Sequence, residues 1–341
     1  MNSRRWRGGV IGCGFFAVNQ MHAWRALPNV EIVALCDLDV NKASEMAAQF
    51  GVPSVYSDVH ELLERERLDF IDIVTTVTSH RALVELAARH CRLIICQKPF
   101  SETLTDADRM LDVCAQAGVS LLVHENFRWQ QPFQVIASRL QVGAIGALHS
   151  CRLKFRHAYD IYAGQPYLAC VDRLALFDVG THLFDVARVL AGDVRSIWCR
   201  TERLNPAVRG EDTFIAKLQH VNGASTVVDC CFFDNSATHL FPQTLALLEG
   251  SEGSLELRAE YRLRETHGSS VQEHLVEPEV PSWGAKPWHC IQDSVMRLQC
   301  HAIDVLEGRA EPHPSGAHNR DTLALVLAAY ESASRDRVVQ L

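Results

Sequence analysis

The sequence lacks the runs that mark membrane proteins and nucleic-acid-binding proteins. No stretch approaches the roughly 18 consecutive uncharged apolar residues of a membrane-spanning helix. The net charge of −8 is spread without a long run of either sign, which excludes the electrostatic pattern of a protein that binds nucleic acid or an anionic membrane. Hydrophobic content of 48% and charged content of 22% exclude disordered and collagen-like chains. We therefore expect a soluble globular protein whose partner is a small molecule.

The sequence also lacks any C-x-x-C motif, although it has 12 cysteines. Neither Cys230-Cys231 nor the Cys91 and Cys96 pair shows the repeated spacing of a zinc site, so we expect no metal. Scattered cysteines in a long chain are typical of reduced thiols that act as small apolar side chains, which favours a cytoplasmic protein. Ser3-Arg4-Arg5 superficially resembles a twin-arginine export signal, but glycines interrupt the apolar run that follows.

The 341 residues suffice for roughly two domains at about 150 residues each. In the first third, short apolar runs alternate with amphipathic stretches, which predicts a doubly wound parallel α/β sheet of the Rossmann type over residues 1–124. The expected strands are 9–11, 30–36, 70–75, 93–96 and 119–123, and the expected helices are 16–27, 41–50, 59–66, 79–90 and 105–117. Asp58 and Thr105 are predicted helix N-caps, and Gly51 and Gly118 are predicted helix ends.

From residue 125 to residue 341 the pattern predicts a second domain of the α+β class, with a large, open and mostly antiparallel sheet. Its expected strands are 148–157, 194–201, 213–218, 224–233, 244–249 and 254–258, and its expected helices are 131–140, 177–190, 291–306 and 319–334.

A glycine-rich turn lies between the first expected strand and the first expected helix. Its sequence is Gly12-Cys13-Gly14-Phe15-Phe16-Ala17, a G-x-G-x-x-A motif in which the glycines permit a tight turn and close approach of a pyrophosphate. Asp37 follows Gly14 by 23 residues at the end of the second strand, where a carboxylate can accept hydrogen bonds from ribose hydroxyls. Asp37-Leu38-Asp39 contains no basic residue for a 2′-phosphate, so NAD is favoured over NADP.

Two further segments carry titratable side chains in places suited to catalysis. Lys98 directly follows a buried apolar run, at the carboxyl end of a parallel strand, where such sheets bind ligands. Asp178 and His182 are four residues apart in an expected helix, so both can reach one ligand, and Asp185 lies three residues further. Taken alone, a lysine there is more often a solvated charge, and a histidine in such a helix is more often structural.

Together these segments resemble the Gfo/Idh/MocA oxidoreductases. Gln97-Lys98-Pro99 matches the family's Glu-Lys-Pro box, Asp178-Val179-Gly180-Thr181-His182 matches its Asp-x-Gly-x-His helix, and Ala329-Tyr330-Glu331-Ser332-Ala333 matches its closing segment. The resemblance implies that Lys98, Asp178 and His182 form the catalytic group. It also implies that the domain of residues 125–341 binds the substrate and forms the oligomer, a dimer or tetramer, through its sheet. Gln97 departs from the family's glutamate, and Thr76 and Val77 depart from its Thr-Pro-Asn segment.

The resemblance also implies which residues contact each ligand. Four segments resemble the subgroup that includes D-apiose 1-dehydrogenase, namely 95–99, 123–130, 209–212 and 241–245. The residues expected to contact NAD are Gly12, Gly14, Phe15, Phe16, Asp37, Thr75, Thr76, His80 and Gln97. The residues expected to contact a sugar are Lys98, Asn126, Arg128, Tyr159, Asp178 and His182, with Asp160 as a further candidate.

The subgroup resemblance implies oxidation of an aldose at its anomeric carbon to a lactone. For this reaction we expect His182 to be the general base, Lys98 the cationic donor and Asp178 the group that orients the sugar. Neutral Lys98 is the alternative base. Arg128 leaves open an acid sugar, or a purely structural role. Other hypotheses are a polyol, inositol or uronate dehydrogenase, a glycosidase that uses NAD transiently, and a non-catalytic sensor of NAD or sugar.

Overall fold

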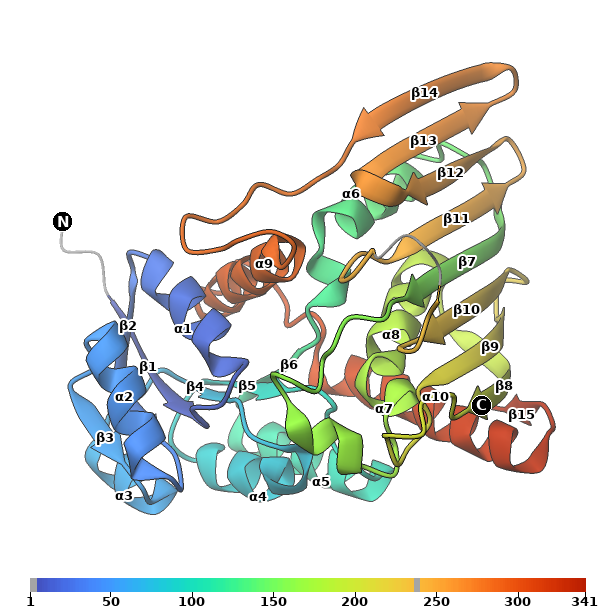
Figure 1. Ribbon diagram of the computed structural model, residues 1–341. Coiled ribbons are helices and arrows are strands. Elements are labelled where there is room, and N and C mark those ends of the chain that lie inside the picture. Colours follow the sequence, from blue (N-terminus) through green and yellow to red (C-terminus); the bar gives the residue numbers. More distant parts are fainter. Residues whose placement is uncertain (1–4, 236–239) are drawn as a thin grey trace. The chain divides into compact units, whose positions relative to one another are not determined.

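The computed structural model describes residues 5–235 and 240–341. The chain divides into two compact units (Figure 1). The first comprises Met1–Glu125 and Val295–Leu323, and the second comprises Asn126–Ser294 and Ala324–Leu341. Along the described chain, no helix is long and apolar enough to cross a membrane.

The first unit contains a six-stranded sheet in the order β3-β2-β1-β4-β5-β6, and every pair in it is parallel. Its strands are β1 (Trp6–Ile11), β2 (Val30–Cys36), β3 (Ser54–Tyr56), β4 (Phe70–Ile73), β5 (Leu93–Gln97) and β6 (Ser120–His124). The connecting helices are α1 (Ala17–Ala26), α2 (Val40–Phe50), α3 (Val59–Arg65), α4 (Val77–Ala87) and α5 (Leu104–Ala117). The predicted doubly wound sheet is confirmed. The strand order reverses between β1 and β4, and such sheets bind ligands beyond the carboxyl ends of their strands at that point.

Local signals set several helix boundaries of the first unit. The Asp58 side chain accepts a hydrogen bond from the backbone N–H of His60, and Gly51 and Gly118 end their helices with φ of 74° and 67°. The predicted N-cap at Thr105 is wrong by two residues, because the Thr103 side chain accepts from the N–H of Asp106 and caps α5. The three-residue strand β3 was not predicted, since so short a run has no readable alternation.

The two units do not divide at one point in the sequence. Residues 295–323, which the sequence-based division after residue 124 places in the second domain, pack with the first unit. Val123 donates its N–H to the Pro314 carbonyl, and the Arg320 guanidinium pairs with Asp108. The helices α9 (His289–Leu306) and α10 (Gly316–Arg335) therefore contribute residues to both units.

The second unit contains a nine-stranded sheet in the order β14-β13-β12-β11-β7-β10-β9-β8-β15. β10 and β7 pair in parallel and the other neighbours are antiparallel, as predicted for a mostly antiparallel sheet. The strands are β7 (Leu148–Arg156), β8 (Val194–Glu202), β9 (Thr213–His220), β10 (Ser225–Cys231), β11 (Leu245–Gly250), β12 (Gly253–Arg258), β13 (Arg262–His267), β14 (Ser270–Leu275) and β15 (Val339–Gln340). The last three were not predicted.

Three helices line one face of this sheet, namely α6 (Gln131–Gln141), α7 (Ala175–Asp178) and α8 (Gly180–Ala191) (Figure 1). Burial alternates along β7, where Cys151, Leu153 and Phe155 are buried while Arg152 and Lys154 are exposed. This alternation is the period of a strand with one face packed and the other solvated. Three short 3₁₀ helices, η1 (Phe127–Trp129), η2 (Pro166–Cys170) and η3 (Ala259–Tyr261), complete the unit.

Candidate active site

The glycine-rich turn joins β1 to α1, as the motif predicts. Gly12 has φ of +99°, and a Cβ there would lie 2.5 Å from the Val74 carbonyl oxygen, so only glycine fits. A Cβ on Gly14 would meet nothing within 4 Å, which leaves that backbone open to a ligand. Ala17 is buried at the start of α1. The turn therefore presents open backbone at a helix N-terminus, where a pyrophosphate binds.

Asp37 holds this turn against the end of β2. Its Oδ2 accepts a hydrogen bond of 2.7 Å from the Cys13 N–H, and its Oδ1 accepts one of 2.9 Å from the Asp39 N–H. Each carboxylate oxygen can accept further hydrogen bonds, so these contacts orient the carboxylate without saturating it. Asp39 is the N-cap of α2 and accepts from the Asn41 N–H. Asp37 thus has a structural role beside the ribose contact that the motif predicts.

His80 is fully buried and lies between two loops of the first unit. Its Nδ1 is 3.2 Å from the Phe100 carbonyl oxygen and its Nε2 is 3.1 Å from the Thr75 carbonyl oxygen. Burial lowers the pKa of the imidazole. A neutral imidazole has a single N–H and can donate to only one of these two carbonyl oxygens, so His80 contacts the Thr75 and Phe100 loops through one hydrogen bond and one close approach. Any contribution to NAD binding would be indirect. Phe15 and Thr76 are exposed, which suits their predicted ligand contacts.

Lys98 directly follows β5, at the carboxyl edge of the parallel sheet. Its side chain is partly exposed, and its backbone N–H donates to Gln97 Oε1 at 2.8 Å. The Gln97 side chain is buried and its Nε2 donates to Gln20 Oε1. Gln97 therefore points into the interior of the first unit. The sequence analysis predicts instead that this side chain contacts the cofactor.

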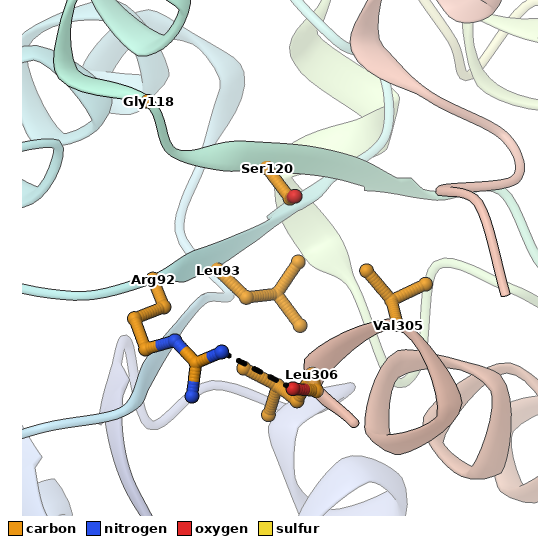
Figure 2. Close-up of a pocket in the computed structure, with 6 residues that line it drawn as sticks. All are labelled: Arg92, Leu93, Gly118, Ser120, Val305 and Leu306. Atoms are coloured by element: carbon orange, nitrogen blue, oxygen red, sulfur yellow. Dashed lines mark hydrogen bonds between the residues drawn. The ribbon is translucent and has the colours of Figure 1, made fainter. Parts of the chain in front are cut away.

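A small hollow lies at the amino ends of β5 and β6, opposite the edge that carries Lys98 (Figure 2). It is lined by Arg92, Leu93, Gly118, Ser120, Val305 and Leu306. Leu93 and Ser120 are the first residues of β5 and β6, and the Arg92 guanidinium donates to the Leu306 carbonyl oxygen. Because ligands bind parallel sheets at the carboxyl ends of the strands, this hollow is no candidate for the cofactor site.

In the second unit, Asp178 and His182 lie on two helices that meet at Val179. Asp178 is the last residue of α7, and α8 begins at Gly180, so the single predicted helix is interrupted there. A Cβ on Gly180 would lie 3.0 Å from Leu176 Cδ1 and 3.3 Å from Phe214 Cζ, so glycine allows close packing at this junction.

The His182 imidazole is 4% exposed and stacks on the ring of Phe127. The ring centroids are 3.9 Å apart and the planes differ by 6°. This contact sets the plane of the ring that is predicted to move the proton. Sequence reasoning missed Phe127, because stacking between η1 and α8 has no local sequence signal.

Arg128, the residue after Phe127, is held by a side chain of α8. Arg128 Nε donates to Asp185 Oδ2 at 2.6 Å, and its Nη2 donates to Asp185 Oδ1. The two side chains are 1% and 0% exposed. The guanidinium is thus already paired with a carboxylate, which disfavours the predicted sugar contact and the acid-sugar alternative. Asn126 is also buried, and its Nδ2 donates to Ser294 Oγ at 2.7 Å.

Tyr159 belongs to a group of rings at the end of β7. It is 43% exposed and stacks on Phe241, with centroids 4.3 Å apart and planes 3° apart. Trp288 meets Phe241 edge-on at 5.1 Å. Ring contacts of Phe155 with Phe127 and with Phe241 connect this group to His182.

The loop that follows Tyr159 brings a hydroxyl near Asp178. Asp160 Oδ1 accepts from the N–H groups of Tyr162 and Ala163, so its carboxylate shapes a turn. Burial, with Asp178 among the nearby carboxylates, raises the pKa of Tyr162 to about 12. The Tyr162 hydroxyl therefore stays protonated, and it has no hydrogen-bond partner among the described residues. Sequence reasoning did not identify Tyr162.

No group of three or more His, Cys, Asp or Glu side chains within residues 5–235 and 240–341 is arranged to hold a metal ion. All cysteines of this part of the chain are free thiols. Burial raises the pKa of several of them, including Cys13, where Asp37 adds to the effect. These buried thiols act as apolar side chains of the core.

Comparison with known proteins agrees with this geometry. Residues 6–125 match the model of an oxidoreductase family with an NAD-binding Rossmann fold, and residues 133–256 match the GFO/IDH/MocA C-terminal domain. The chain is 44% identical to a D-apiose dehydrogenase of Rhizobium rhizogenes over 100% of this chain and 99% of that one. It is 46% identical to a D-apiose dehydrogenase of Paraburkholderia graminis over 99% and 90% of the two chains.

A solved structure shares the fold over nearly the whole chain. It is an oxidoreductase from Agrobacterium radiobacter in complex with NAD⁺, L-tartaric acid and magnesium. The TM-score is 0.97 with 44% identity, and 98% of each chain is covered. The glycine turn, the strand-end lysine and the α7–α8 junction, together with these full-length likenesses, show that the chain belongs to the Gfo/Idh/MocA family of NAD-binding oxidoreductases.

Proposed function

We propose that the protein oxidises an aldose at its anomeric carbon to a lactone, with D-apiose as the leading candidate. The observation that carries this proposal is the likeness, over essentially the full length, to two proteins named D-apiose dehydrogenases. Lys98, Asp178 and His182 are all present, which favours catalysis over sensing. The partly exposed rings of Tyr159, Phe241 and Trp288 suit a ligand with both C–H and hydroxyl faces, since small-molecule sites combine aromatic walls with a few polar groups.

The residues of the first unit fit NAD. Gly12 and Gly14 leave backbone open for the pyrophosphate, and the Asp37 carboxylate retains acceptor capacity for ribose hydroxyls. NAD⁺, when bound, supplies a hydride acceptor. The protein must remove the hydroxyl proton and stabilise the negative charge that develops on oxygen.

We assign His182 as the base, because its ring is held in one plane by Phe127 and imidazole is the side chain that most often transfers protons in enzymes. Lys98 donates to the reacting oxygen, and Asp178 orients the sugar through a neighbouring hydroxyl. The protonated Tyr162 hydroxyl is a further donor near Asp178. The rival assignment makes neutral Lys98 the base. Activity of Lys98→Arg comparable to wild type would favour a cationic role, because arginine cannot act as a base near neutral pH.

The deciding experiment measures kcat/KM with NAD⁺ for apiose, common pentoses and hexoses, inositol and uronates, following absorbance of reduced nicotinamide. The product is then identified. A lactone from apiose or another neutral aldose supports the proposal. Activity confined to inositol or to a uronate would overturn it, and sugar cleavage without net NAD⁺ reduction would point to a redox-assisted hydrolase.

We also propose that the protein forms a homodimer or homotetramer through the nine-stranded sheet. Helices line one face of the sheet (Figure 1). Along β9 the exposed Ile215 alternates with the buried Phe214 and Ala216, so Ile215 lies on the other face. Light scattering on wild type and Ile215→Glu tests this proposal. A lower mass for the variant supports it, and a monomeric wild type would overturn it.

A further inference from the structure

A chain of buried hydrogen bonds runs from β4 to the backbone of Lys98. Gln20 Nε2 donates to both carboxylate oxygens of Asp72 at 2.9 Å. Gln97 Nε2 donates to Gln20 Oε1 at 3.3 Å, and the Lys98 N–H donates to Gln97 Oε1 at 2.8 Å. Trp24 Nε1 also donates to Asp72 Oδ2, at 2.8 Å. Side chains from α1, β4 and β5 thus converge on the residue that follows β5.

The direction of this chain is determined from both ends. A backbone N–H can only donate, so Gln97 must present its oxygen to Lys98 and its amide N–H to Gln20. Gln20 must then present its own N–H to Asp72, where the indole N–H of Trp24 also arrives. Asp72 therefore meets only donors here, and the chain ends on an acceptor that suits an ionised carboxylate.

The direction of these hydrogen bonds places the negative charge on Asp72 and not on the residue beside Lys98. Asp72 is completely buried, and Gln97 is a neutral residue directly beside Lys98. Burial raises the pKa of Asp72 to about 7, while the hydrogen bonds from Trp24 and Gln20 lower it. The charge at the end of the chain thus depends on the amide and indole donors that surround it.

We propose that Asp72 and Gln20 are positioning residues, which hold Gln97 in the one orientation that accepts from the Lys98 backbone. A misdirected Gln97 leaves the start of the Lys98 side chain unanchored, and small displacements of a catalytic group reduce turnover. The inference rests on the proposed function insofar as Lys98 touches the substrate. It is specific to a glutamine at position 97, because an ionised glutamate there has no N–H to give Gln20.

Each single change in this chain should leave one mismatched contact. In Gln97→Glu, the new carboxylate faces the Gln20 oxygen, and turning the Gln20 amide places that oxygen against Asp72. In Asp72→Asn, the new amide N–H₂ faces the Gln20 N–H₂. If the Gln20 amide turns over, its N–H₂ then faces the Gln97 N–H₂ instead. In the double variant, a turned Gln20 donates to the new carboxylate at position 97 and accepts from the new amide at position 72. This restores one donor–acceptor pair at each link, in place of the two hydrogen bonds that Gln20 gives Asp72 in the wild type.

The experiment is a double-mutant cycle of Asp72→Asn and Gln97→Glu, measured as kcat, as KM for sugar and as the dissociation constant for NAD⁺. We expect each single variant to lose roughly tenfold or more in kcat, and the double variant to recover to within about threefold of wild type, because contacting residues couple strongly. Trp24→Phe is the matched control. It removes one donor to Asp72 without touching the Gln20 to Lys98 segment, so it should lower stability and leave kcat nearly unchanged.

Losses that multiply in the double variant would overturn the inference, as would a Trp24→Phe kcat as low as that of Asp72→Asn. The free energy of unfolding in urea is measured for the same four proteins. The double variant should lose less stability than the sum of the losses in the two single variants. If wild type oxidises no sugar, the proposed function fails while this unfolding cycle still tests the hydrogen-bond chain.

Discussion

Two completely buried aspartates, one in each unit of the protein, are compensated in different ways. Asp185 in α8 faces a guanidinium, that of Arg128, through two hydrogen bonds. Asp72 in β4 receives hydrogen bonds from the neutral side chains of Gln20 and Trp24. A full opposite charge compensates desolvation better than neutral donors do, and the neutral donors around Asp72 leave its pKa raised. Both aspartates orient a segment next to a predicted catalytic residue.

Breaking the charged pair should have the largest effect. Asp185→Asn removes the negative charge that pairs with the buried Arg128 guanidinium, which should cost about 3–5 kcal/mol in the free energy of unfolding. The control is Asp172→Asn, because the side chains of the Arg209–Asp172 pair are 65% and 71% exposed. That exposed pair should contribute less than about 1 kcal/mol. Equal losses in urea unfolding would contradict the role given to the buried pair.

The neutral environment of Asp72 should appear as a pH dependence of stability. Its folded-state pKa of about 7 exceeds the ordinary value of 3.8, so the folded protein binds this proton more tightly than the unfolded chain. The stabilisation that this proton gives the folded protein is fully present below about pH 4 and is lost as the pH rises through about 7. The loss in the free energy of unfolding is a few kcal/mol at most. Asp72→Asn should flatten this slope, and the exposed Asp39→Asn should not. An unchanged slope in Asp72→Asn would show that the carboxyl is not perturbed.

The residues that these two arrangements support should dominate catalysis. His182→Ala and Lys98→Ala should each lower kcat by about a hundredfold or more while NAD⁺ still binds, because proton transfer or charge stabilisation is lost. The double variant should be far from additive, since such groups act as a unit. Steady-state kinetics and NAD⁺ titration of the three variants provide the test. Near-normal turnover in both single variants would favour a sensing protein.

The smallest effect concerns an aspartate that is not buried. Asp37→Ser should narrow the preference for NAD over NADP, because a carboxylate at the ribose repels a 2′-phosphate. Asp39→Ser is the matched control, since Asp39 caps α2 and is not predicted to contact the ribose. The measurement is the pair of dissociation constants for each variant. Wild type that binds NADP as tightly as NAD would refute the role of Asp37.

Sequence reasoning succeeded where the signal is local. The glycines of the β1–α1 turn, the strand that leads into Lys98, and the αL helix ends at Gly51 and Gly118 each follow from residues within a few positions. Asp178 and His182 were predicted to lie on one helix, but α7 ends at Asp178 and α8 begins at Gly180. Gly180 packs closely against Phe214 of β9, which is a contact across the fold that no local pattern specifies.

The sequence by itself determined the alternation of strands and helices, the cofactor turn and the identities of the predicted catalytic side chains, because backbone preferences and hydrophobic periodicity are local properties. Only the tertiary structure decided what the polar side chains bind. Arg128 pairs with a residue 57 positions away, and Gln20 with one 52 positions away. A buried polar group must find a partner wherever the fold supplies one, and no local pattern specifies which distant residue that is.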